Sequence, residues 1–212
     1  QHRKDNREFG RFLEQESAYV VGDDIFYIFE VGRVHAGGRV FDRFFDDELL
    51  PTCLKTGLIR EQKLAIDGFS LGGASSVYHA IRRPDLFSSC GSFDGAFLKY
   101  EFDNPLLFPE TPSDLRFDEF PYLFDFPPDE KEFRKQNPLD MVTRKFLLPP
   151  TMIHYSNSQS PTANGWRVEY FLKNSRIKNY ANKPLINYYS DHTWWWVDEH
   201  LYRTLPFHSS FF

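Results

Sequence analysis

Short apolar runs alternate with stretches of helical spacing along most of this chain of 212 residues. Runs rich in β-branched and aromatic residues predict strands, and apolar residues that recur every three or four positions predict helices. The predicted strands are one or both of 18–22 and 25–31, then 63–67, 88–93, 151–155 and 184–189. The predicted helices are 40–55, 74–82, 137–145, 166–174 and 194–205, and Pro51 is expected to kink or end the first of them. This alternation predicts an α/β fold with a mostly parallel, doubly wound sheet.

One long segment, residues 99–137, interrupts the alternation. It contains six prolines among Phe, Asp and Glu residues, and this proline density argues against a strand or a long helix. Two interpretations are open: an ordinary surface insertion, or a lid over a site, since long loops in compact domains are often functional. We expect both ends of the segment near the carboxyl edge of the sheet, where open α/β folds bind ligands. The rest of residues 1–212 is predicted to form a single domain around it.

Length and charge narrow the class of protein. The chain is long enough to bury a sizeable core, and its net charge of −5, without a basic block, argues against nucleic acid as a partner. No apolar run approaches the length of a membrane span, and no signal peptide opens the sequence. The two cysteines, Cys53 and Cys90, do not fix the redox compartment. These features predict a soluble enzyme domain, with a cytoplasmic location favoured over a secreted one.

The motif that carries most chemistry is Gly-Phe-Ser-Leu-Gly at residues 68–72. It follows an apolar run, and a predicted helix follows it, which is the strand, tight turn and helix of a nucleophile elbow. Gly68 and Gly72 have no side chains, so the backbone can pass close to a strained Ser70. The start of the helix then directs backbone N–H groups to the place where an oxyanion would form.

A serine hydroxyl needs a base within hydrogen-bond reach and a group that orients the base. In the elbow fold the histidine comes last, after the final strand, and His192 directly follows the predicted strand 184–189. The other six histidines are His2, His35 and His79, His154 in a predicted strand, His200 in the last helix and His208 in the tail. Position therefore favours His192. No histidine has metal-ligand spacing with carboxylates, so we predict no metal and no cofactor.

The sequence from Ala65 to Gly73, followed by Arg-Pro-Asp-Leu-Phe at 83–87, resembles the Putative esterase family of α/β-hydrolases. That family includes esterase D (S-formylglutathione hydrolase), feruloyl and acetylxylan esterases, enterochelin-esterase-like proteins and the antigen 85 mycolyltransferases. His-Thr-Trp-Trp-Trp at 192–196 and Leu-Pro-Phe at 205–207 resemble the family's C-terminal blocks. The resemblance implies an α/β-hydrolase fold and ester hydrolysis by a Ser-His-acid triad. It assigns Ser70 as nucleophile, His192 as base and the Leu71 N–H as one oxyanion donor.

The acid of the triad departs from the family pattern. The family's acid follows the strand that matches 151–155, and alignment there places Ser158 in its slot, in the loop 156–160. A hydroxyl can orient an imidazole but does not stabilise an imidazolium as a carboxylate does. Asp94, one strand past the nucleophile, is the candidate that compensates, because strand ends at the carboxyl edge converge on one crevice. The alternative is that Asp94 and Gly95 form only a turn.

A second departure concerns the beginning of the chain. Family members have several strands before the region that matches residue 18, and one of their loops supplies the other oxyanion donor. Either the chain is truncated or its sheet is small, so we expect an N-terminally short version of the fold.

Three functions follow from these residues. The first is a serine carboxylesterase acting on a small-molecule or carbohydrate ester, such as a feruloyl or acetyl ester. The second is an inactive esterase-fold binding protein, and the third is an acyltransferase of the same family. Aromatic residues suit sugar rings and feruloyl groups alike. We therefore assign substrate binding to Phe69, Leu71, Trp194 and Trp195, and expect at least one residue of 194–196 to pack in the core.

Overall fold

The computed structural model describes residues 27–29, 44–55, 64–100, 130–142, 148–156, 164–175, 185–186 and 190–212. The predicted strand 18–22, residues 101–129 of the proline-rich segment, and Ser158 lie outside these ranges. No helix within the described ranges is long and apolar enough to cross a membrane.

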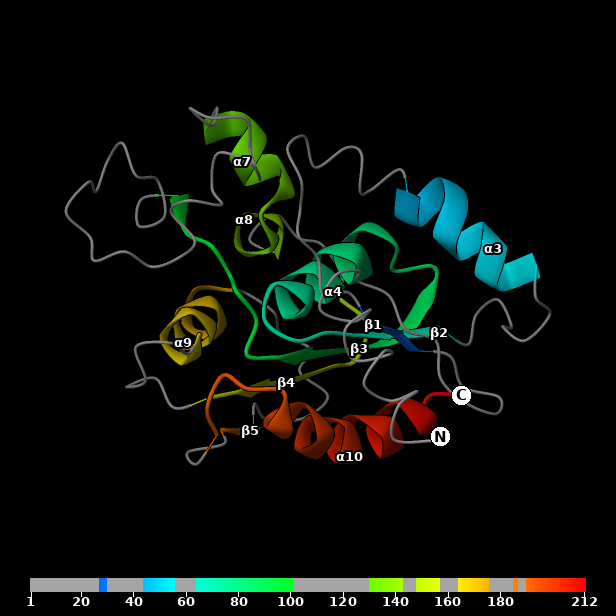
Figure 1. Ribbon diagram of the computed structural model, residues 1–212. Helices are drawn as coiled ribbons and strands as arrows, with labels where there is room; N and C mark the ends of the chain where they lie inside the picture. The colour runs from blue at the N-terminus through cyan, green and yellow to red at the C-terminus, as the bar shows by residue number, and fades with distance from the viewer. Residues whose placement is uncertain are drawn as a thin grey trace, which may run out of the picture.

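A parallel sheet forms the centre of the fold (Figure 1). Its described strands are β1 (Tyr27–Phe29), β2 (Leu64–Asp67), β3 (Phe87–Phe93), β4 (Thr151–Tyr155) and β5 (Leu185–Ile186). They lie side by side in chain order, and every pairing between described strands is parallel. All of them therefore end at the same edge, where the turn after β2 and the turn after β3 are neighbours.

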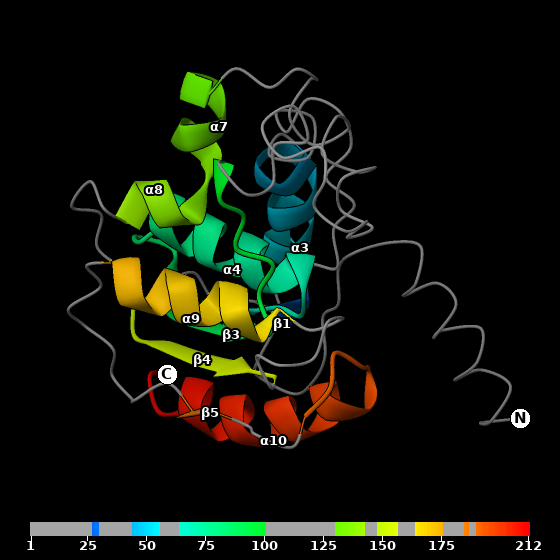
Figure 2. The ribbon, with the colours of Figure 1, turned by 90° about the vertical axis from the view of Figure 1, so that its left-hand side faces the viewer.

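Helices cover both faces of this sheet (Figures 1 and 2). On one face lie α4 (Leu71–Arg82), α8 (Pro138–Val142) and α9 (Gly165–Asn174), and α10 (Trp195–Ser209) lies on the other. The other helices in the described ranges are α3 (Leu50–Lys55), which continues the π-helical turn η1 (Phe44–Leu49), and α7 (Glu130–Gln136). This two-sided arrangement is the doubly wound α/β fold that the alternation of the sequence predicts.

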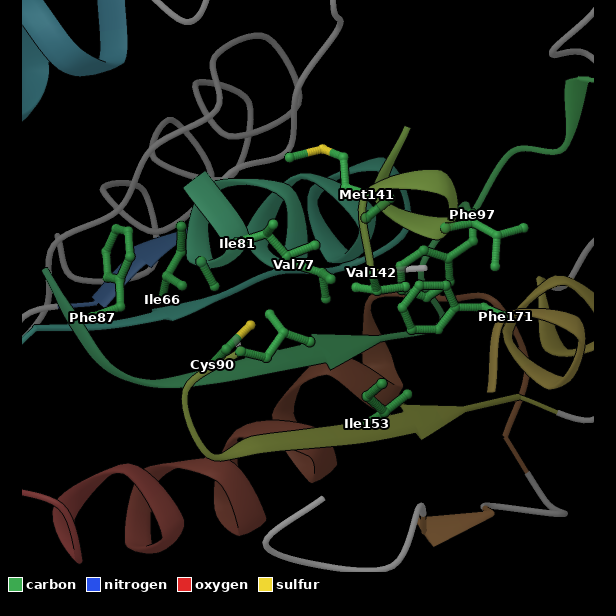
Figure 3. Close-up of a cluster of buried hydrophobic side chains, with 14 of the residues drawn as sticks. Ile66, Val77, Ile81, Phe87, Cys90, Phe97, Met141, Val142, Ile153 and Phe171 are labelled. Carbon is green, nitrogen blue, oxygen red and sulfur yellow. The ribbon is translucent and has the colours of Figure 1, made fainter. Parts of the chain in front are cut away.

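Strand alternation divides the buried residues between the two faces. Ile66, Cys90 and Ile153 point toward α4 and belong to the main hydrophobic core, together with Val77 and Phe171 (Figure 3). Since successive side chains of a strand point to opposite faces, their sequence neighbours face α10 instead. Those neighbours are polar and fully or almost fully buried: Asp67, Ser89 and His154.

Three local expectations need correction. Helix α4 begins at Leu71 rather than residue 74, because the elbow leads into it without a linker. Pro51 does not end its helix: the chain changes from π to α geometry at Leu50, and α3 runs on to Lys55. Helix α10 runs past Pro206 to Ser209, so His208 is a buried helix residue and not part of a tail.

The described residues that flank the proline-rich segment contact each other, Tyr100 on one side and α7 on the other. The ring of Tyr100 lies 5.4 Å from that of Phe133 in α7, and the Arg134 guanidinium lies over the Tyr100 ring. Phe133 is itself buried. The described residues on either side of 101–129 therefore pack against each other.

Candidate active site

Ser70 occupies a strained turn between β2 and α4. Its backbone has φ 59° and ψ −119°, a conformation that residues other than glycine rarely adopt. The turn is tight enough that a Cβ on Gly68 would lie 2.1 Å from the carbonyl oxygen of Gly72. Glycine is therefore required at position 68, as expected for a nucleophile elbow.

Backbone hydrogen bonds fix this turn to the end of the neighbouring strand β3. The Ser70 N–H donates to the Phe93 carbonyl at 2.9 Å, and the Ala96 N–H donates to the Ser70 carbonyl at 2.8 Å. These two bonds lie on either side of Asp94 in the sequence. The residue that carries the candidate nucleophile and the residue that carries the candidate acid are therefore joined by a short, rigid piece of backbone.

Asp94 is completely buried, and its carboxylate accepts four hydrogen bonds. Oδ1 accepts from the backbone N–H and the hydroxyl of Ser156, and Oδ2 accepts from the Asn164 N–H and from His192 Nδ1. Burial alone would raise the pKa of this carboxyl, but the hydrogen bonds it accepts, that from His192 above all, hold the pKa below its usual value. Asp94 is thus an ionised carboxylate in a dry environment.

His192 is held between Asp94 and an aromatic ring. Its Nδ1 lies 2.5 Å from Asp94 Oδ2, and its ring lies 4.6 Å from that of Phe69. Since the Asp94 carboxylate has no proton to donate, His192 Nδ1 carries the hydrogen and Nε2 presents a lone pair. The His192 side chain is one-fifth exposed, so this lone pair is available beside the elbow.

The hydroxyl of Ser70 forms no hydrogen bond with any residue in the described ranges. Catalytic hydrogen bonds are often long in structures without substrate and tighten when one binds. Phe69, the residue before Ser70, contacts the His192 ring, which places the serine and the imidazole at one end of the sheet.

The start of α4 supplies a candidate oxyanion site. The first N–H groups of a helix have no acceptor within the helix, and here Gly73 and Ala74 donate back to the Ser70 carbonyl. The Leu71 N–H, adjacent to the serine, is the one predicted to receive an oxyanion.

The three consecutive tryptophans have different surroundings. Trp194 is 44% exposed and meets the ring of Phe69, the residue before Ser70, edge-on at 5.2 Å. Trp195 is 76% exposed, and Trp196 packs against a small buried cluster of Phe69, Phe93 and Val197. The structure therefore brings Trp194, rather than Trp195, next to the elbow, and Trp196 is the tryptophan that packs inside.

Two residues around Asp94 were not assigned from the sequence. Ser156 begins the loop in which the family carries its acid, and Asn164 caps α9. Both donate to the Asp94 carboxylate, and the Asn164 side-chain amide also donates to the Asp94 carbonyl. The loop that matches the family's acid loop therefore supports a carboxylate from the neighbouring strand, and only a structure shows that relation.

Solved structures with this arrangement are α/β-hydrolases. The chain is similar to an S-formylglutathione hydrolase from Agrobacterium tumefaciens (17% identity, TM-score 0.61, covering 80% of this chain and 57% of the other). It is also similar to a ferulic acid esterase (16%, TM-score 0.55, 81% and 61%) and to FphF, a fluorophosphonate-binding serine hydrolase of Staphylococcus aureus (15%, TM-score 0.54, 79% and 62%). At such identities the likeness shows the fold, and the chain spans 57% to 62% of the length of these structures.

The family is shown by the sequence itself. Residues 32–207 match the model of the Putative esterase family, so the protein belongs to that family of serine hydrolases acting on esters. No curated protein matches the chain significantly.

Proposed function

We propose that this protein is a serine carboxylesterase in which Ser70 is the nucleophile, His192 the general base and Asp94 the acid that orients it. The observation that carries this proposal is the hydrogen bond of His192 Nδ1 to the buried Asp94, next to a serine in the strained elbow conformation. Family membership supports the reaction class, and the triad supports its mechanism.

The chemistry would proceed in two halves. Ser70 Oγ attacks the ester carbonyl carbon while His192 Nε2 takes its proton, and the Leu71 N–H stabilises the oxyanion of the tetrahedral intermediate. The intermediate collapses as the imidazolium returns the proton to the departing alcohol, which leaves an acyl-serine. Water, activated by His192 in the same way, then releases the carboxylic acid and restores the serine.

The buried Asp94 is suited to the role of acid. Its negative charge attracts the imidazolium that forms during each half-reaction, in a site where little solvent screens it. The bonds from Ser156 and Asn164 fix the carboxylate, so that His192 keeps the tautomer with its lone pair at Nε2. Asp94 itself would stay ionised throughout.

Two other functions use the same residues. A missing carboxylate at Ser158 would favour an inactive binding protein, but the contact between Asp94 and His192 counts against that interpretation. An acyltransferase would need only an alcohol in place of water. No observation favours it over hydrolysis, so the esterase remains the proposal.

The substrate class is proposed from the aromatic residues next to His192. Trp194 presents a half-exposed ring that packs on the buried Phe69 next to His192, which suits a small ester with an aromatic or sugar group, such as a feruloyl or acetyl ester of a carbohydrate. The similarity to a ferulic acid esterase and to an S-formylglutathione hydrolase agrees with a small ester, although each of those activities belongs to the neighbour.

The experiment that tests the proposal is covalent labelling. The full chain is incubated with a fluorophosphonate probe, and the labelled peptide is identified by mass spectrometry, with Ser70→Ala as control. We expect one adduct on Ser70 and hydrolysis of p-nitrophenyl acetate, both absent from Ser70→Ala. A folded wild-type chain that neither reacts with the probe nor hydrolyses the ester would overturn the proposal in favour of the binding protein.

A further inference from the structure

A second group of buried ionisable side chains lies between the sheet and α10. The carboxylate of Asp67, at the end of β2, contacts His200 Nε2 at 2.6 Å and His208 Nε2 at 3.3 Å. The second nitrogen of His208 meets the Ser89 hydroxyl at 2.7 Å, and all four side chains are buried. We call this group, together with His154, the Asp67 network.

His154 of β4 completes the network. Its Nδ1 lies 2.7 Å from His200 Nδ1, while its Nε2 is buried and has no hydrogen-bond partner among the described residues. Burial, followed by repulsion from His200, lowers the pKa of His154 to about 3, so this imidazole is neutral at neutral pH.

The contacts join these side chains into two branches that start at one carboxylate. Ionised Asp67 accepts from His200 Nε2–H and from His208 Nε2–H. The Nδ1 atoms of those two rings lie against His154 Nδ1 and the Ser89 hydroxyl, respectively. The network therefore connects β2, β3 and β4 to α10 through buried polar contacts.

The backbone makes room for that charge. A Cβ on Gly91 of β3 would lie 2.5 Å from the Asp67 carboxyl group, so only glycine leaves the space that Asp67 occupies. Burial would raise the pKa of Asp67, but attraction to His200 and the hydrogen bonds from both histidines lower it far below its usual value. The carboxylate is thus held ionised in the interior by partners on α10.

The network is connected to the backbone or helix that holds each proposed triad member in place. Asp67 Oδ1 accepts from the Gly68 N–H at the entrance to the elbow of Ser70. The backbone carbonyl of His154 accepts from the Asp94 N–H at 2.9 Å. His200 belongs to α10, which begins three residues after His192.

Stacked rings lead from the network to the site. The ring of His200 lies 5.3 Å from that of Phe93 and nearly parallel to it, and Phe93 in turn lies 5.2 Å from Phe69. Phe69 contacts the His192 ring. Displacing His200 would therefore disturb a continuous stack that ends at the proposed base.

We infer that the Asp67 network, acting through His200, positions α10 and His192 relative to Ser70 and Asp94. His200 is a positioning residue, since it contacts neither the serine nor the base. This inference rests on the proposed function, because it assigns the network to the same site. A metal role does not fit: both nitrogens of His200 and of His208 are engaged in hydrogen bonds, and no group within the described ranges is arranged to hold a metal.

The test compares His200→Phe with Leu86→Ala. His200→Phe keeps a ring against Phe93 but breaks the hydrogen bonds of His200 to Asp67 and His154. Leu86→Ala removes buried volume at the turn between α4 and β3, away from the network. We measure the labelling rate of Ser70 by a fluorophosphonate, kcat and KM on p-nitrophenyl acetate, and the low-field proton resonance of the bond between His192 and Asp94. All are taken at temperatures where circular dichroism shows equal folded fractions.

We expect His200→Phe to lose about a hundredfold in kcat and in labelling rate with KM little changed, since a misplacement of about 1 Å can have that effect. The low-field resonance should shift or vanish, and Leu86→Ala should keep wild-type values. Wild-type kcat and resonance in folded His200→Phe would overturn the inference. If that variant does not fold, Asp67→Asn, which keeps the shape and removes the charge, decides by the same measurements. A wild-type chain that is itself unlabelled refutes the proposed function instead.

Discussion

Asp94 and His192 lie 98 positions apart in the sequence and meet through a single contact of 2.5 Å between Asp94 Oδ2 and His192 Nδ1. The carboxylate comes from the end of β3, the strand next to the one that leads into Ser70. It does not come from the loop after β4, in which the family pattern places its acid. In our proposal the carboxylate reaches His192 from the end of the neighbouring strand instead.

Replacing the carboxylate tests this assignment. Asp94→Asn removes the charge that stabilises the imidazolium and favours the wrong tautomer of His192, so kcat should fall by on the order of 10⁴-fold. The measurement is the hydrolysis of p-nitrophenyl acetate at several pH values.

The control is Asp191→Asn, which removes a carboxylate that is exposed and adjacent to His192 in sequence. Its kcat should stay near that of the wild type. Full activity of Asp94→Asn together with lost activity of Ser158→Ala would show instead that the hydroxyl in the family's acid slot orients the base.

The Ser156 hydroxyl should help to keep the pKa of Asp94 low. It donates to Asp94 Oδ1 at 2.6 Å and contributes to the lowered pKa of that carboxyl. In Ser156→Ala the Asp94 pKa should rise, which a pH titration of the Asp94 carboxyl resonance in the ¹³C NMR spectrum measures. A loss of about tenfold in kcat is expected at neutral pH, as for one charge-assisted hydrogen bond.

Ser75→Ala is the matched control, because it removes a hydroxyl of α4 that lies outside the site. Its Asp94 titration curve should superimpose on that of the wild type. If the Asp94 titration curve of Ser156→Ala does the same, Ser156 does not act on the charge of Asp94.

Stability should depend on pH through His154. Its pKa is about 3 in the folded protein against 6.5 in the unfolded chain, so between these values the unfolded state binds more protons. The free energy of unfolding should therefore decrease as the pH falls below about 6.5, by up to about 1.4 kcal/mol per pH unit. Below about pH 4 the lowered pKa values of Asp67 and Asp94 add to this loss, since their protonation also favours the unfolded state.

Urea unfolding between pH 4.5 and 7.5 measures this slope. His154→Gln should be less stable at neutral pH but should show a flatter dependence, because the titrating group has been removed. Ile153→Val, a conservative change at the preceding residue of β4, should keep the wild-type slope. Equal slopes in His154→Gln and the wild type would rule out His154 as the source.

Much of the fold follows from local patterns. The limits of β4 agree with the predicted 151–155, and the elbow sequence predicts the strand, turn and helix around Ser70. These features depend on residues that are close in sequence. The proposal of Asp94 also needed only the rule that parallel strands end at one edge.

The partners of the buried polar residues could not be predicted from local patterns. Asp67 meets His200 and His208 at separations of 133 and 141 residues, and no local pattern encodes which histidine faces which carboxylate. One signal was available: a charged residue at the end of an apolar, buried strand requires partners. The continuation of α10 through Pro206 hid the second of them, because a proline usually ends a helix.

The last prediction concerns Trp194 and Trp195, the two exposed tryptophans that follow His192 in the sequence. Trp194 meets Phe69 beside His192, whereas Trp195 is more exposed, so only Trp194 should contact a substrate. An aromatic contact contributes about 0.5–1.5 kcal/mol, which corresponds to roughly a two- to tenfold change in KM. Trp194→Ala should therefore raise KM for methyl ferulate by about that factor, with kcat little changed and p-nitrophenyl acetate less affected. Trp195→Ala, the neighbouring change of the same size, should leave both substrates unaffected. If the two variants behave alike, Trp194 does not select the substrate, and the proposal of an aromatic or sugar ester loses its structural support.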